Sequence, residues 1–359
     1  MGSSDRIDCA CRNDSRMVEV FQRPTGRGSD VKRTAAFGMI FCVFLPSFSW
    51  GAAPFRSFEV PTAFSLPARV AIDKAGSVWV IEVNTNKLAR FQTAEETFVE
   101  YDIPTRGSIP SDVVIDGQGR VWYTAQDANQ LGVFDPVSLS FKEFNIPTIQ
   151  SVPYRITTEN DGNIWFTEFY GNKVGMFDAR KQVFREYPIP TPASRPVGIA
   201  TDSRGLVWFI ESEGNKLGRL DTKDGTVREF PMPNAFEAPM DLAVDALGTL
   251  WFAGRKGRAL MLFDPLAESF EVFPLPSGNS VESLTVGADG KVFFSLRRTG
   301  KIGVFDPENG RFLEVKAGLG DSHPKGIAVD RGGNIWFADI RKNALFKVDG
   351  DAVSKLWLK

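Results

Sequence analysis

A large aromatic residue recurs along this chain at an almost constant spacing. Six tryptophans and one phenylalanine follow one another at steps of 42 or 43 residues: Trp79, Trp122, Trp165, Trp208, Trp251, Phe293 and Trp336. A period in this range indicates a repeat protein, in which one supersecondary unit is copied along the chain. The 359 residues are therefore not two or three unrelated domains, although the length alone would suggest that division.

Each repeat has the pattern of four short strands. In the copy that begins at Pro196, the apolar segments cover residues 198–201, 207–211, 216–221 and 227–231. Gly, Pro, Asn or Asp bounds each segment, which is typical of strands separated by turns. A glycine stands three residues before the aromatic in all seven copies, where a tight turn with positive φ requires it. The sequence predicts an all-β fold, a seven-bladed β-propeller of four-stranded blades, with each aromatic packed against the next blade.

Closure of the ring has two candidates in the sequence. Residues 58–62 (FEVPT) match the end of an outer strand at residues 101–105 (YDIPT), so the amino-terminal segment can complete the last blade. The tail at residues 354–358 also has the pattern of an outer strand. Only one segment can occupy that position, and the sequence leaves the choice open. No helix is expected in the ring.

Residues 1–53 lie outside the repeats. A basic pair at residues 32–33 precedes an 11-residue apolar segment at 35–45, and small residues follow it. This is the pattern of a secretory signal peptide, which we expect to be cleaved between residues 51 and 53; a buried helix or a membrane anchor is the alternative. The apolar segment is too short to span a bilayer as a helix.

The expected mature chain is one propeller at residues 54–359. It is exported, to the periplasm or outside the cell, and has no membrane span. All three cysteines lie in the leader, so the mature chain has no disulfide and no thiolate site. The formal net charge is −2, so no basic surplus points to nucleic acid. We expect a monomer.

Three segments of the repeats carry a family resemblance. Residues 162–168 (GNIWFTE), 171–175 (GNKVG) and 186–191 (EYPIPT) resemble the streptogramin B (virginiamycin B) lyase family. The resemblance covers essentially residues 55–359 and implies a seven-bladed propeller. Enzymes of that family linearise a cyclic depsipeptide antibiotic by elimination, with a magnesium ion. The resemblance therefore implies Mg²⁺, or another divalent cation, as the cofactor to test.

The resemblance also implies two histidines, each directly after the proline that opens one of the last two blades, and a carboxylate at the end of the last blade's second strand. Here Glu282 and Lys325 hold the histidine positions, and Asp339 is nearest to the carboxylate. The only histidine, His323, stands one residue before Pro324. Elimination needs a base and a cation. Either these three residues form a substituted catalytic set, or Lys325 and Glu282 form a salt bridge, so the sequence leaves open whether the chain is an enzyme.

Departures from the repeat gather on one face, where the loops into the first strand and after the second strand lie together. The candidates for ligand binding on this face are Arg69, Tyr154, Arg155, Glu168, Glu211, Arg255 and Arg297. The cations among them suit an anionic ligand.

Each candidate has an alternative interpretation. Arg255 and Arg297 are otherwise a solvated rim, and Arg69 and Arg155 can pair internally with Asp112 and Asp241. Two glutamates on adjacent blades, at positions 168 and 211, offer oxygen ligands to a divalent cation. They can equally be part of the repeat, bonded to the neighbouring Asn-Lys loop.

These observations favour an exported propeller that binds a small anionic or peptide-like ligand on this face. One alternative is a carbon–oxygen lyase or metal-dependent lactonase that uses Lys325, Glu282 and Asp339. Another is a protein-interaction scaffold with no small-molecule site. The fold hosts all three classes, so the chemistry of the site has to separate them.

Overall fold

The computed structural model describes residues 19–21, 55–159, 162–233, 239–254, 258–316 and 320–357, with only the backbone at residues 19–21 and at Trp357. The predicted signal peptide, its cleavage site and Arg255 lie outside these residues, so what the sequence predicts of them stays a prediction.

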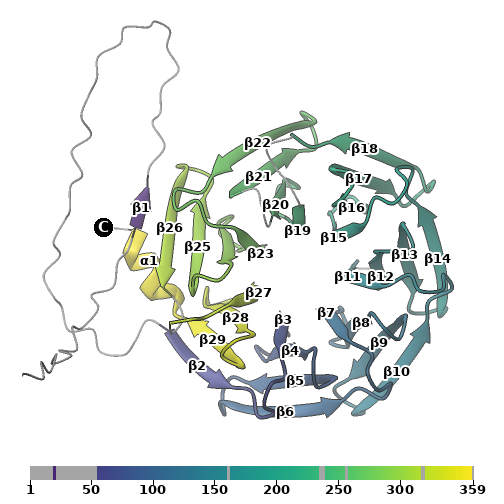
Figure 1. Cartoon of the computed structure of the whole chain (residues 1–359), viewed down its shortest axis with the longest axis horizontal. Coiled ribbons are helices and arrows are strands. Elements are labelled where there is room, and N and C mark those ends of the chain that lie inside the picture. Colours follow the sequence, from purple (N-terminus) through teal and green to yellow (C-terminus); the bar gives the residue numbers. More distant parts are fainter. Residues whose placement is uncertain are drawn as a thin grey trace, which may run out of the picture.

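Seven antiparallel sheets stand around a central axis, which confirms the predicted seven-bladed β-propeller (Figure 1). Blade one contains β3 (Pro67–Ile72), β4 (Val78–Glu82), β5 (Lys87–Gln92) and β6 (Thr97–Asp102). Blade two contains β7 (Pro110–Ile115), β8 (Val121–Ala125), β9 (Gln130–Asp135) and β10 (Ser140–Asn145). Blade three contains β11 (Pro153–Thr158), β12 (Asn163–Glu168), β13 (Lys173–Asp178) and β14 (Val183–Pro188).

The remaining blades follow the same order from the axis outward. Blade four contains β15 (Pro196–Thr201), β16 (Leu206–Glu211), β17 (Lys216–Asp221) and β18 (Val227–Pro231). Blade five contains β19 (Pro239–Val244), β20 (Leu250–Gly254), β21 (Ala259–Asp264) and β22 (Ser269–Pro274). Blade six contains β23 (Val281–Val286), β24 (Val292–Leu296), β25 (Lys301–Asp306) and β26 (Arg311–Lys316), and the backbone of β1 (Glu19–Phe21) pairs with β26.

Blade seven is built from both ends of the ring. Its strands are β27 (Pro324–Val329), β28 (Ile335–Asp339), β29 (Ala344–Val348) and, as the outer strand, β2 (Phe55–Glu59). The amino-terminal segment therefore closes the ring, as one of the two alternatives predicted, and β2 pairs with β29 from Phe55 opposite Val348 to Glu59 opposite Ala344.

The expectation of a strand in the tail, and of no helix, is wrong. The chain forms α1 (Gly350–Trp357), which lies beside β26 (Figure 1). Asp349 accepts a hydrogen bond from the backbone N–H of Ala352 at 3.0 Å, as a helix-capping residue does. Val353 and Leu356, three residues apart on one helix face, pack on the apolar core of blades six and seven. No helix of the described residues is long and apolar enough to cross a membrane.

The repeated aromatic packs between blades, as predicted. The ring of Trp79 lies 5.8 Å from that of Phe134 in blade two, and Trp79 is fully buried. Burying a side chain of this size stabilises the fold by roughly 2–3 kcal/mol. Asp73 accepts backbone hydrogen bonds within the turn, from Ala75 at 3.0 Å and Ser77 at 2.9 Å, and its other oxygen accepts the Trp79 Nε1–H at 3.0 Å. One carboxylate thus fixes both the turn and the tryptophan.

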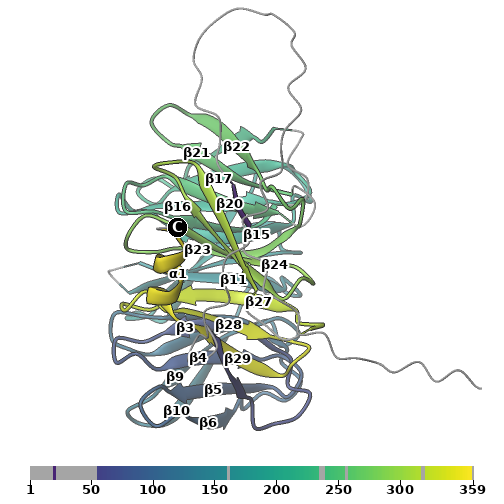
Figure 2. The ribbon, with the colours of Figure 1, turned by 90° about the vertical axis from the view of Figure 1, so that its left-hand side faces the viewer.

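Figure 2 shows the ring as a disc seen from its edge, and the two faces of this disc carry different connections. The loops into the first strand of each blade and the loops between its second and third strands share one face, here called the top face. The turns between the first and second strands, and between the third and fourth, share the opposite bottom face. The predicted site residues that the structure describes belong to the top face or to the first strands that surround the axis.

Candidate functional site

The strand register places Asp339 without ambiguity. Asp339 pairs with Pro324 at the start of blade seven, just as Glu168 pairs with Pro153 in blade three and Glu211 with Pro196 in blade four. Asp339 therefore occupies the repeat position that holds glutamate elsewhere, at the end of the second strand.

Glu282 and Lys325 form a salt bridge at the top of blades six and seven. The Lys325 Nζ lies 2.7 Å from Glu282 Oε1, and the Arg297 Nε lies 3.4 Å from Glu282 Oε2. The Glu282 side chain is 4% exposed, whereas those of Lys325 and Arg297 are 28% and 33% exposed. One buried carboxylate thus holds two cations that face solvent. We call Glu282, Arg297 and Lys325 the charged cluster.

His323 adjoins the charged cluster, which the sequence did not predict. Burial lowers the pKa of His323, against the attraction of Glu282, so the imidazole is neutral at neutral pH. Its Nε2 is buried and has no hydrogen-bond partner among the described residues. Its position directly before the proline that opens blade seven was the available signal, but spacing alone does not show which way the ring turns.

Asp339 is held by its surroundings. Oδ2 accepts hydrogen bonds from the Ser322 hydroxyl and from the His323 backbone N–H, the latter at 2.7 Å. Oδ1 accepts the backbone N–H groups of Arg341 and Lys342 at 2.9 and 3.0 Å. These four bonds make Asp339 a brace for the loops on either side of it.

The residues at the family's catalytic positions do not fit a magnesium site. Mg²⁺ requires oxygen ligands in near-octahedral geometry. Here the Lys325 ammonium lies against Glu282. Both carboxylate oxygens of Asp339 already accept hydrogen bonds, four in total, so neither is placed to bind a metal ion. Within the described part of the chain, no group of three or more His, Cys, Asp or Glu side chains is placed to hold a metal ion.

Arg69 and Arg155 meet two aspartates in the channel, which is the internal pairing that the sequence offered as the alternative. Arg69 Nη1 lies 3.1 Å from Asp241 Oδ2 and donates to Ser283 Oγ at 2.8 Å, while its Nε lies 3.8 Å from Asp112 Oδ1. Arg155 Nε lies 3.7 Å from Asp241 Oδ1. We call these five residues the channel network.

The channel network is nearly closed to solvent. The side chains of its two arginines and two aspartates are 10–13% exposed. Burial disfavours the charged form of Arg69, but the attraction of Asp241 and Asp112 outweighs it and raises its pKa above the usual range. Burial raises the pKa of Asp112 to about 6, against the pull of Arg69. The arginines here neutralise buried carboxylates.

Glu168 and Glu211 are buried inside their own blades. Both carboxylates are fully buried. Among the described residues, no donor forms a hydrogen bond of normal geometry with either carboxylate. Burial, followed by repulsion from Glu186 in blade three and Glu229 in blade four, raises their pKa values to about 8 and about 7. The lysine of the Asn-Lys loop pairs instead with the outer glutamate, as Lys173 does with Glu186 at 2.6 Å.

Tyr154 belongs to an aromatic group at the top of blade three. Its ring lies 5.6 Å from that of Phe169, and the Arg155 guanidinium lies 5.0 Å from the Tyr154 ring centre. The Arg195 guanidinium lies 4.2 Å from the ring centre of Tyr170, which is 59% exposed. Tyr170 and Arg195 were missed in the sequence, although an aromatic pair after the second strand breaks the repeat.

A profile of the virginiamycin B lyase family matches residues 52–260 and, in an overlapping alignment, residues 140–355. A streptogramin B lyase structure is similar at 26% identity and TM-score 0.76, over 82% of this chain and 96% of that one. A catalytically inactive variant of virginiamycin B lyase from Staphylococcus aureus, solved with quinupristin, is similar at 26% identity and TM-score 0.76, over 82% and 98%.

More distant structures share the fold alone. The extracellular domain of a one-component system from B. thetaiotaomicron is similar at 12% identity and TM-score 0.66, over 82% of this chain and 39% of that one. No curated protein matches the sequence.

Proposed function

Because this chain belongs to the virginiamycin B lyase family, we propose that it is an exported, lyase-like propeller that binds a small anionic or peptide-like ligand on its top face, over the charged cluster. Export rests on the signal-peptide pattern of the leader. The top face gathers loops from all seven blades, and such a ligand would lie over them.

One observation carries the proposal: Lys325 and Arg297 share the single carboxylate of Glu282. Two cations against one carboxylate leave a net charge of +1. About a third of each cationic side chain is exposed, so an anionic group arriving from solvent can reach both.

A carbon–oxygen lyase is the second candidate. The register of Asp339 favours it, since a carboxylate stands where the family resemblance implies one. The base is the weak point, because an ammonium held 2.7 Å from a carboxylate is not a free amine that can take a proton. A lactonase that depends on a metal ion is less favoured, because these side chains do not fit Mg²⁺.

Titration calorimetry with a short peptide that has a free carboxylate tests the binding proposal. We expect the peptide to bind, and Arg297→Glu to weaken it by about tenfold or more, since a charge-assisted contact becomes a repulsion. The matched control is Arg331→Glu, the same charge change in a turn on the bottom face, which should leave the affinity unchanged. Absence of binding, or equal weakening in both variants, would overturn the proposal.

Incubation with quinupristin, followed by mass spectrometry, separates binding from chemistry. Elimination opens a ring without changing its mass, whereas hydrolysis adds one water. We expect quinupristin to be recovered unchanged. A ring-opened product of unchanged mass that disappears in Lys325→Met would instead establish the lyase.

A further inference from the structure

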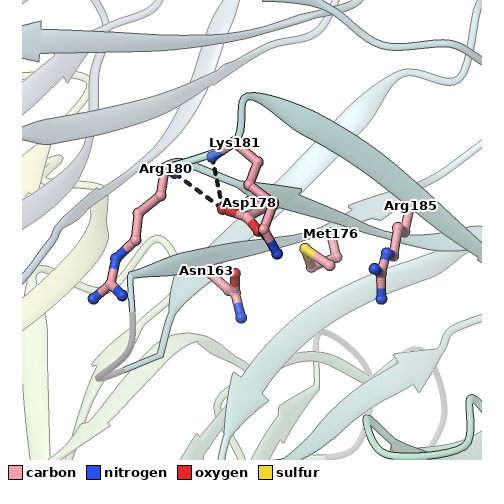
Figure 3. Close-up of a pocket in the computed structure, with 6 residues that line it drawn as sticks. All are labelled: Asn163, Met176, Asp178, Arg180, Lys181 and Arg185. Atoms are coloured by element: carbon pink, nitrogen blue, oxygen red, sulfur yellow. Dashed lines mark hydrogen bonds and ion pairs between the residues drawn. The ribbon is translucent and has the colours of Figure 1, made fainter.

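Blade three carries a groove on the bottom face that the charged cluster and the channel network do not use. Its volume is about 320 Å³, and it is lined by Asn163, Met176, Asp178, Arg180, Lys181 and Arg185 (Figure 3). Figure 3 shows Asn163 and Met176 between Arg180 on one side and Arg185 on the other. We propose that this groove, here called the blade-three groove, binds a tetrahedral oxyanion such as a phosphate group.

The charge of the groove favours an anion. Three cationic side chains and one carboxylate line the groove, which gives the lining a net charge of +2, and the Glu159 carboxylate adjoins it, 3.3 Å from Asn163 Nδ2. The lining carboxylate is already engaged, because Asp178 Oδ1 accepts the backbone N–H groups of Lys181 and Arg180 at 2.9 and 3.0 Å. The Lys181 Nζ lies 3.3 Å from Asp178 Oδ2. Neither Arg180 nor Arg185 has a side-chain partner in the part of the chain that the structure describes.

The repeat explains why Arg185 is unpaired. At the equivalent outer-strand position, Arg228 in blade four pairs with Glu268 in the next blade, and Arg56 in blade seven pairs with Glu96 in blade one. Both partners stand 40 residues further along the ring. The same step from Arg185 reaches Gly225, which has no side chain. The adjacent acid, Asp224, accepts both the N–H and the hydroxyl of Thr226 instead.

The repeat also explains why the groove is open. In blades one and four, an arginine of the third strand lies over the buried tryptophan. The guanidinium carbon of Arg90 lies 5.5 Å from the Trp79 ring centre, and that of Arg219 lies 5.8 Å from the Trp208 ring centre. Met176 holds this position in blade three. A neutral methionine, 7% exposed, leaves free the space that a guanidinium fills in those blades.

These groups select an oxyanion rather than a simple halide. Guanidinium groups match the paired oxygens of phosphate or sulfate, and an ammonium adds a point charge beside them. The phosphate can belong to a small solute or to a lipid head group, since all three cationic residues are exposed. The chemistry of recognition is the same in both cases.

Titration calorimetry of the full chain with inorganic phosphate, at constant ionic strength against chloride, tests the site. We expect binding on the order of millimolar, weakened about tenfold in Arg185→Gln, because a charge-assisted contact is lost. Arg228→Gln is the matched control, since its guanidinium is already held by Glu268, and it should bind phosphate like the parent chain.

A second pair of variants tests the missing counter-ion directly. Gly225→Glu places at this position the carboxylate that blades one and five carry and should abolish phosphate binding, whereas Gly225→Gln has the same shape and should retain it. Gly225 has φ +77° where Glu268 and Glu96 have +49° and +56°, and both variants carry the same backbone strain, so Gly225→Gln controls for it. An added Cβ would lie 3.2 Å from the Tyr187 ring, and this contact is the same in both variants.

Sedimentation with phosphatidylcholine vesicles, with and without phosphatidic acid, distinguishes the two sources of phosphate. Binding to the acidic vesicles that is lost in Arg185→Gln indicates a lipid head group, and binding only to dissolved phosphate indicates a solute. The proposal is wrong if phosphate gives no more heat than chloride, or if Arg185→Gln and Arg228→Gln weaken it equally.

Discussion

Three glutamates at the ends of second strands, Glu82, Glu168 and Glu211, are buried, and none of them forms a salt bridge with another described residue. Burial raises their pKa values to about 7, about 8 and about 7. A carboxyl whose pKa is higher in the folded chain than in the unfolded chain keeps its proton longer when folded. The carboxyl therefore contributes fully to stability at pH values below its pKa in the unfolded chain. This contribution is lost as the pH rises through its pKa in the folded chain.

Glu168→Gln tests this behaviour at the residue with the largest shift. Each unit of pKa is worth about 1.4 kcal/mol. We expect the variant to raise the free energy of unfolding by about 2–4 kcal/mol at about pH 8, and by little at about pH 4, because glutamine mimics the neutral acid. Urea unfolding at both pH values measures the difference.

Glu186→Gln is the matched control, with the opposite sign. Burial opposes its ionisation, but hydrogen bonds from Lys173 and Thr148 hold the pKa of Glu186 below its usual range. This variant should be less stable than the parent at neutral pH, and the loss should shrink as the solution is acidified. The same pH profile for both variants would contradict the assignment.

At this scale the sequence predicted interactions that the period imposes and missed those that depend on loop geometry. The tight turn after Asp73 was predicted, because a glycine stands three residues before the aromatic in every copy, and Gly76 has the expected positive φ. The salt bridge of Lys325 with Glu282 was one of two alternatives. The addition of Arg297 and His323 was not predicted, because neither follows from repeat spacing.

At the scale of elements, the closing strand β2 is joined to its blade without a covalent turn. The Phe58 ring lies 4.4 Å from Phe91 in blade one and 6.1 Å from Trp336 in blade seven. The tail was the element that the sequence misassigned. In so short a segment, the apolar residues fit the strand period of two about as well as the helix period of 3.6. The packing of Val353 and Leu356 on the core of blades six and seven favours the helix.

Phe58→Ala tests how the ring is held closed. We expect a loss of about 2–3 kcal/mol in the free energy of unfolding, because the ring is only partly buried. Amide hydrogen exchange should accelerate in β2 and β29. Phe144→Ala is the matched control: Phe144 holds the same position in blade two, 4.5 Å from Phe177, but its strand is joined to the blade by a turn. If Phe144→Ala accelerates amide exchange in the outer strand of blade two as much as Phe58→Ala does in β2, the closing strand has no special role.

At the scale of the whole molecule, one position in the first strand of every blade faces the axis. Around the ring it holds Arg69, Asp112, Arg155, Gly198, Asp241, Ser283 and Gly326. The charges balance as two arginines against two aspartates. At Gly326, a Cβ would lie 2.8 Å from the Arg69 Cα, so the absence of a side chain makes room for the arginine. The period predicts which residues face the axis, but only the assembled ring shows that Arg69 reaches from blade one to blades five and six.

Arg69→Met should therefore destabilise the ring as a whole. Removing one partner of a buried ion pair leaves the other charge uncompensated and costs about 3–5 kcal/mol. Adding Asp241→Asn to the variant should restore part of the loss, since one stranded charge is then removed. Arg56→Met, which breaks a solvent-exposed pair with Glu96, should leave the free energy of unfolding nearly unchanged. Urea unfolding of the four chains measures these differences, and similar losses in the two single variants would show that the channel network does not hold the blades together.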